Sequence, residues 1–106
     1  MTIFIRGLVL AALLLGASAS ATTPEDAALQ ALTDRAASFG LRSADLTDVR
    51  VRDRVPTRHN GVTHVWMQQY IDGLPVALGV ANANVLADGR VASLHSRMSA
   101  DARSRT

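Results

Sequence analysis

The sequence contains no cysteine and no lysine, and Glu25 is its only glutamate. Without cysteine, the chain has no disulfide framework, no thiolate zinc site and no thiol nucleophile. It also has no H-E-x-x-H sequence, so it lacks the helical zinc site in which two histidines flank a glutamate base. All of its basic residues are arginines, and the formal net charge of +2 is too small for a dedicated nucleic-acid binder.

Other catalytic motifs are also missing from the sequence. There is no glycine-rich phosphate loop and no G-x-S-x-G sequence that would present a nucleophilic serine. The histidines are His59, His64 and His95, and the last two fall on different predicted strands without a third metal ligand. We therefore expect no catalytic residue, no bound metal and no cofactor. Trp66 and Tyr70 share one face of a predicted strand, but no basic groove accompanies them, which favours packing over stacking on bases.

A long apolar run occurs only near the N-terminus. Arg6 precedes the run from Leu8 to Leu15, and small residues follow it up to Ala21. A positive charge, a short apolar stretch and an A-x-A exit are typical of a secretory signal peptide, with cleavage after Ala19 or Ala21. A membrane anchor is the alternative, but a membrane span needs about 20 apolar residues.

We therefore expect a secreted or periplasmic protein with no stable membrane anchor after cleavage. Its predicted organisation is a signal peptide over residues 1–21, a folded domain over 22–98 and a polar tail or start of a linker over 99–106. The arginine-only, alanine-rich composition is typical of a GC-rich bacterial genome.

One helix is predicted at the start of the exported part. Thr23 suits its N-cap, Pro24 its first turn, and an acidic pair follows at the positive end of the helix dipole. Apolar residues then recur at helical spacing and form one apolar stripe: Ala28, Leu29, Leu32, Ala36 and Phe39. Gly40 follows the stripe and suits the left-handed conformation in which many helices end.

Strand patterns occupy the rest of the domain. Between Asp48 and Val55 valines alternate with arginines, so we expect Val49, Val51 and Val55 to face the core. Three residue pairs then separate the strand-like runs, and each favours a type I′ hairpin turn: Asn60–Gly61, Asp72–Gly73 and Asp88–Gly89. The predicted fold class is α+β, with the N-terminal helix packed on an antiparallel β-meander of about four strands.

Two glutamines, a histidine and a glycine interrupt the strand patterns. Gln68 and Gln69 are adjacent, so a regular strand turns one of them toward the helix, where its carboxamide needs hydrogen-bond partners. A buried glutamine that bonds to loop backbone would fix the register of its hairpin. His64 has the opposite parity to Gln69, and the sequence leaves open which of the two is buried. Gly79 predicts a bulge or a close backbone approach in the following strand.

The stretch from Asn60 to Val76, NGVTHVWMQQYIDGLPV, resembles the signature of the fungalysin/thermolysin propeptide (FTP) domain. The shared pattern runs Gly-Val-Thr-His, an apolar or aromatic stretch, Gln-Gln, and a glycine turn leading to Pro-Val. The resemblance covers about Leu41 to Leu94 and includes the Asp-Gly turn between the last two strands. It implies motif roles, structural rather than catalytic, for His64, Gln69, Gly73, Pro75 and Val76.

The resemblance implies a non-catalytic prosegment that assists the folding of a secreted zinc metalloprotease of the thermolysin or fungalysin type and inhibits it. The implied partner is the metalloprotease catalytic domain, in cis or in trans, and no nucleic acid is expected. Precursors of the family continue into a second propeptide module and a catalytic domain with H-E-x-x-H, which is absent here. Three explanations stay open: the N-terminal fragment of a longer precursor, a free-standing copy of the propeptide domain, or a stand-alone secreted protein-binding module.

Overall fold

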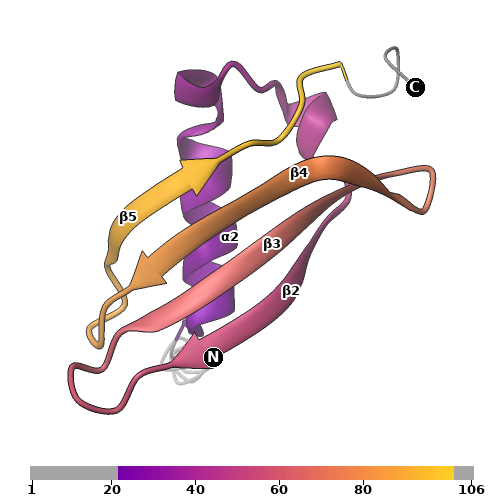
Figure 1. The fold of residues 1–106 in the computed structure, drawn as a ribbon. Helices are drawn as coiled ribbons and strands as arrows, with labels where there is room; N and C mark the ends of the chain where they lie inside the picture. The colour runs from indigo at the N-terminus through magenta and orange to yellow at the C-terminus, as the bar shows by residue number, and fades with distance from the viewer. Residues whose placement is uncertain (1–21, 102–106) are drawn as a thin grey trace, which may run out of the picture.

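The computed structural model describes residues 22–101. The expected signal peptide, residues 1–21, and the last part of the expected tail, residues 102–106, lie outside the described residues. The described elements are α2 (Pro24–Asp34), the 3₁₀ helices η1 (Ala36–Phe39) and η2 (Ser43–Leu46), and the strands β2 (Val49–Pro56), β3 (Thr63–Ile71), β4 (Leu74–Val85) and β5 (Val91–Ser96) (Figure 1). Among the helices described in residues 22–101, none has the length and hydrophobicity of a membrane-spanning helix.

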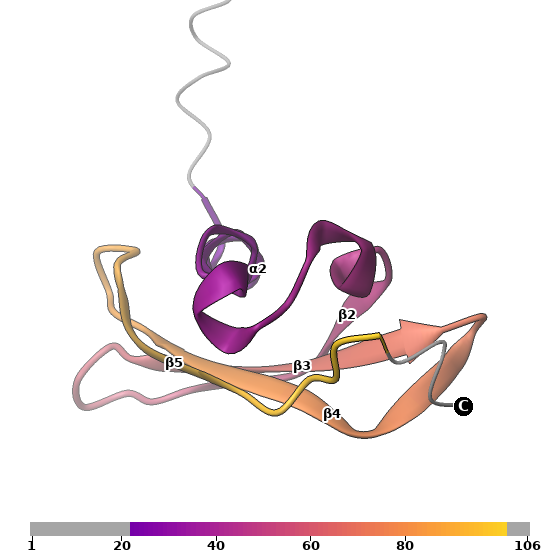
Figure 2. The ribbon, with the colours of Figure 1, turned by 90° about the horizontal axis from the view of Figure 1, so that it is seen from above.

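The four strands form one antiparallel sheet in the order β2-β3-β4-β5, and all helices lie on one of its faces (Figure 2). This confirms the predicted α+β fold with a helix packed on a four-stranded meander. The core lies between α2 and the sheet, and its members come from every layer: Ala28, Ala31, Leu32, Ala36, Leu41, Val65, Met67, Ala81, Ala83, Val85, Leu94 and Met98. Small residues in α2 and β4 let the helix approach the sheet closely.

The N-terminal helix begins where the sequence predicts and ends earlier. The Thr23 hydroxyl accepts a hydrogen bond from the N–H of Asp26 at 3.1 Å, and Pro24 occupies the first turn. The helix stops at Asp34, and the last part of the apolar stripe forms η1 instead. Gly40 then takes the left-handed conformation with φ 73°, and the N–H of Leu41 bonds back to the carbonyl of Ala36 at 2.9 Å.

The first strand corrects the predicted alternation of valines and arginines. Val49 and Val51 face the helices, opposite Gln69 and Met67, but the register shifts before Asp53. Because this bulge adds one residue, Val55 pairs with His64 on the outer face and is 44% exposed. Arg54 instead pairs with buried Val65, and its Nε lies 3.3 Å from the Glu25 carboxylate at the start of α2.

Only one of the three predicted hairpin turns has two residues with positive φ. Asp72 and Gly73 have φ values of 51° and 80°, as a type I′ turn requires, and they join the paired residues Ile71 and Leu74. The other two connections are longer, over residues 57–62 and 86–90. The predicted pairs therefore mark all three hairpins, whereas the tight turn geometry is restricted to the β3–β4 hairpin.

Candidate functional site

The candidate site is the part of the sheet where β3 and β4 lose their regular pairing. Gln68 pairs with Val80 and Tyr70 pairs with Pro75, so the four residues 76–79 lie opposite Gln69 alone. Gln68 and Gln69 are both buried, with 7% and 0% of their surface exposed. Adjacent side chains of a regular strand point to opposite faces, so the bulge is what encloses the second glutamine.

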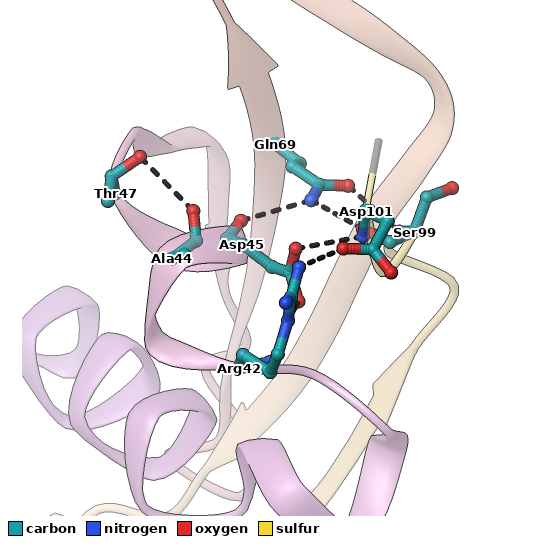
Figure 3. A network of polar contacts seen from close by, with 7 residues as sticks. All are labelled: Arg42, Ala44, Asp45, Thr47, Gln69, Ser99 and Asp101. Carbon is teal, nitrogen blue, oxygen red and sulfur yellow. Dashed lines mark hydrogen bonds and ion pairs between the residues drawn. The ribbon is translucent and has the colours of Figure 1, made fainter. Parts of the chain in front are cut away.

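Gln69 points to the helical side of the sheet and joins three segments of the chain (Figure 3). Its Nε2 donates to the carbonyl oxygens of Asp45, at 3.0 Å, and Ser99, at 2.9 Å. Its Oε1 accepts a hydrogen bond from the N–H of Ser99 at 2.9 Å. Both donor hydrogens and the acceptor oxygen are therefore used, as burial of a carboxamide demands. The bonds fasten β3 to η2 and to the segment that leaves β5.

Asp45 is the second buried polar residue at this place and is 5% exposed. Its carboxylate accepts hydrogen bonds from the backbone N–H groups of Arg42, at 2.8 Å, and Asp101, at 2.9 Å. The bond from Arg42 and then that from Asp101 hold the pKa of Asp45 below its ordinary value of 3.8. The Arg42 guanidinium lies 3.6 Å from the same carboxylate and also pairs with the side chain of Asp101.

We call this network the exit junction, because it fixes the chain as it leaves the sheet. It consists of Arg42, Asp45, Gln69, Ser99 and Asp101 (Figure 3). Ser99 and Asp101 belong to the expected polar tail and are hydrogen-bonded to Gln69 and Asp45. Reasoning from the sequence identified Gln69 and missed the other four members. Asp45 carried one available signal, since an aspartate in a short turn often accepts a hydrogen bond from nearby backbone.

Gln68 lies on the other side of β3 and holds the bulge itself. Its Nε2 donates to the carbonyl oxygens of Val76, at 2.9 Å, and Gly79, at 3.2 Å, and it lies 3.0 Å from that of Gln69. These partners belong to a single short stretch of β4, unlike the distant segments that Gln69 joins. Between the two held carbonyls, Leu78 takes the left-handed conformation with φ 60°.

Gly79 is buried between the two glutamines and leaves no room for a side chain. A Cβ at this position would lie 2.9 Å from the Val76 Cβ and 3.0 Å from the Gln69 Oε1. The sequence predicted a bulge or a close backbone approach at this glycine, and the structure shows both. The bulge therefore depends on a glycine as well as on the Gln68 amide.

The remaining motif residues lie near the β3–β4 turn, apart from His64, which lies near the other end of β3. Gly73 completes the type I′ turn, Pro75 is exposed beside it, and Val76 is half-buried at the start of the bulge. His64 is half-buried on the outer face, away from the exit junction, and its Nδ1 bonds to the Asn84 side chain. The question that the sequence left open has a clear answer: Gln69 is fully buried and His64 is not.

Arg50 and Tyr70 on the outer face contact each other, and Arg50 also has an acidic partner. The Arg50 guanidinium lies 3.9 Å from the centre of the Tyr70 ring and bonds to the Asp48 carboxylate at 2.9 and 3.0 Å. Trp66 is 41% exposed and lines a shallow hollow with Arg52 and Asp53. No group of three or more metal-binding side chains occurs within residues 22–101. The carboxamide and carboxylate groups of the candidate site hold backbone segments by hydrogen bonds.

Comparison with known families identifies the sheet that carries these residues. Residues 47–98 match the family model described as Fungalysin/Thermolysin Propeptide Motif, a non-catalytic domain. No curated protein and no solved structure matches the chain. The matched range includes all four strands, the β3–β4 bulge and both buried glutamines. The chain therefore carries a fungalysin/thermolysin propeptide domain over residues 47–98.

Proposed function

We propose that this domain is a propeptide module that assists the folding of a secreted thermolysin- or fungalysin-type zinc metalloprotease and inhibits it. The family match supports the proposal, because the matched residues coincide with the complete β2–β5 sheet. A propeptide motif implies association with a protease catalytic domain. The part played by this chain would be binding, with no bond-breaking of its own.

The exit junction gives this role a physical basis. A module that guides the folding of a following or neighbouring polypeptide has to present its own surface in a fixed orientation. Gln69 and Asp45 hold Ser99 and Asp101 against η2, so the direction of the chain is set as it leaves the sheet. A surface that is already ordered loses less conformational entropy when a partner binds, which strengthens association.

A stand-alone secreted protein-binding module is the second candidate function. Leu74 and Leu78 are each 69% exposed, and exposed leucines favour protein contacts in either case. The gene sequence beyond Thr106 separates the explanations. An in-frame continuation with H-E-x-x-H indicates a protease precursor, whereas a stop codon indicates a propeptide acting in trans or a separate binding module.

A refolding assay tests the proposed function directly. The thermolysin- or fungalysin-type catalytic domain encoded in the same genome is unfolded and refolded with and without the purified chain. We expect the chain to raise the yield of folded protease and to reduce the activity of the protease already folded. The heat-unfolded chain serves as the control for non-specific effects. Equal yield and equal activity at a large molar excess of chain would contradict the proposal.

A further inference from the structure

The β3–β4 hairpin carries several exposed apolar side chains. Leu74 and Leu78 are each 69% exposed, the largest values among the exposed large apolar residues of the described chain. Pro75 and Ala77 between them are exposed as well. We call these four residues the apolar tip. Single exposed apolar residues are common on protein surfaces, whereas a contiguous group is typical of an interaction site.

The apolar tip is held in a conformation that adds no side chain to the hydrophobic core. Leu78 has φ 60°, a region that disfavours residues with a Cβ, and most of its side chain faces solvent. The Gln68 amide maintains this conformation through the carbonyls of Val76 and Gly79. A glycine at position 78 would take the same backbone conformation without strain. A leucine held outward at this position therefore points to a contact made outside the domain.

The apolar tip also lies near the place where the chain leaves the sheet. The hairpin extends beyond the helices, and the segment that follows β5 runs over the same end of β4 (Figures 1 and 2). The N–H of Arg97 bonds to the carbonyl of Val80 at 2.8 Å, and Ser99 is bound by Gln69 next to the bulge. A polypeptide that continues from this domain would start beside the apolar tip.

We propose that the apolar tip is the contact through which this domain binds the metalloprotease catalytic domain, with Leu74 and Leu78 entering an apolar pocket of that partner. The inference rests on the proposed function and adds the surface that performs it. Because the bulge holds Leu78 before binding, docking the tip needs little ordering of the hairpin. Exposed leucines that become buried at the centre of a contact are the side chains expected to dominate its affinity.

Binding of variants to the partner tests the apolar tip. The purified chain, its Leu74→Ser/Leu78→Ser variant and a Val55→Ser control are titrated into the refolded catalytic domain by calorimetry. Val55 is a matched control because it is 44% exposed on the outer face of β2, away from the hairpin. We expect the double variant to lose about a hundredfold in affinity, about tenfold per leucine, and the control to bind like the original chain.

Each outcome separates the apolar tip from the proposed function. Equal melting temperatures for the three chains show that the fold is retained. A Leu78→Gly variant removes the side chain without adding backbone strain, so a loss of affinity in this variant confirms that the leucine side chain makes the contact. If the double variant binds as tightly as the original chain, the contact lies elsewhere and the inference is wrong, while the proposed function stands. If the original chain itself does not bind, both fail. Self-association that the double variant abolishes would also overturn the inference, because the tip would then bind a second copy.

Discussion

Gln68 and Gln69 are neighbours of the same residue type on β3, yet they hold different parts of the molecule: Gln69 holds the exit junction and Gln68 holds the apolar tip. Gln69 bonds to Asp45 and Ser99, which lie 24 and 30 residues away in the sequence, and is completely buried. Gln68 bonds to backbone of the β3–β4 hairpin and keeps Leu78 facing outward. The exit junction therefore joins distant segments, which stabilises the fold, whereas the apolar tip holds strain and exposed apolar surface that the fold does not need.

The two regions share Gly79, which touches both of them. Its carbonyl accepts from Gln68, and its Cα faces the Gln69 Oε1. A buried amide is therefore not by itself a mark of stability or of function. Whether a buried amide serves stability or function depends on the segments to which it bonds and on the side chains that those segments expose.

The largest expected effect is that of Gln69→Leu on stability. The substitution leaves the carbonyl oxygens of Asp45 and Ser99 and the N–H of Ser99 without their side-chain partner in a buried place. We expect the free energy of unfolding to fall by about 3–4 kcal/mol, since each unsatisfied buried group costs about 1–3 kcal/mol and part of the cost is relieved by relaxation. Urea unfolding followed by far-UV circular dichroism measures the change.

Gln68→Leu is the matched control for that substitution. It removes bonds to two carbonyl oxygens of one local stretch, whereas Gln69→Leu removes bonds to three groups on distant segments, so we expect a smaller loss of about 1–2 kcal/mol. Equal losses for the two variants would contradict the distinction between the exit junction and the apolar tip.

The next effect is that of Gly79→Ala, which strains both regions at once. The new methyl group would lie 2.9 Å from the Val76 Cβ and 3.0 Å from the Gln69 Oε1, so β4 or the amide has to shift. We expect a loss of about 2 kcal/mol, within the range of over-packed sites. Thermal unfolding with calorimetry checks the value.

Gly73→Ala provides the comparison, because its φ is 80° and no atom lies within 4 Å of the added Cβ. Only backbone strain acts there, and we expect a loss of about 1 kcal/mol. If Gly73→Ala lowers the free energy of unfolding more than Gly79→Ala does, close packing at the bulge is not the reason that position 79 requires glycine.

A third effect is the pH dependence that Asp45 gives to the exit junction. Its folded-state pKa is lowered, chiefly by the Arg42 N–H, so its carboxylate stabilises the folded state at pH values above its ordinary pKa of 3.8. This stabilisation is lost as the pH falls below that value and through the lower folded-state pKa.

We expect Asp45→Asn to lower the free energy of unfolding by about 1–2 kcal/mol at about pH 6, because an amide cannot accept both backbone bonds equally well. At about pH 2.5, below the ordinary pKa of Asp45, the difference in stability between the variant and the original chain should be smaller. Urea unfolding at the two pH values measures the difference. An unchanged difference at both values would mean that the charge of Asp45 contributes nothing to the junction.

The parts of the fold that follow from local rules could be predicted from the sequence. Thr23 and Pro24 mark the start of α2, and the Asp72–Gly73 pair marks a turn that only such residues form easily. The strand count and the meander follow from turn signals between apolar runs. The family signature located the stretch with both glutamines, because it depends on residue types in order and not on their orientation.

The orientation of side chains could not be predicted, because two bulges depend on contacts across strands. The bulge in β2 turns Val55 outward and brings Arg54 to Glu25, although strict alternation predicts the reverse. The bulge in β4 buries both glutamines, where alternation allows only one. The partners Asp45 and Ser99 come from far along the chain, so no spacing rule connects them to Gln69. The motif role of His64 stays a prediction, since its contacts are with the outer face of the sheet.

The smallest expected effect is that of Leu78→Gly, which should maintain or raise, rather than lower, the free energy of unfolding. It therefore separates the apolar tip from the exit junction most clearly. Leu78→Gly removes a Cβ from a residue with φ 60° and exposes no new core surface, because the leucine is already 69% exposed. The strain relieved is about 1 kcal/mol, and the greater freedom of glycine in the unfolded chain offsets part of it. We therefore expect the free energy of unfolding to stay equal or to rise by up to about 1 kcal/mol, measured by urea unfolding beside Gln69→Leu. A clear loss of stability would show that the Leu78 side chain packs within the domain, and the apolar tip would then be part of the fold.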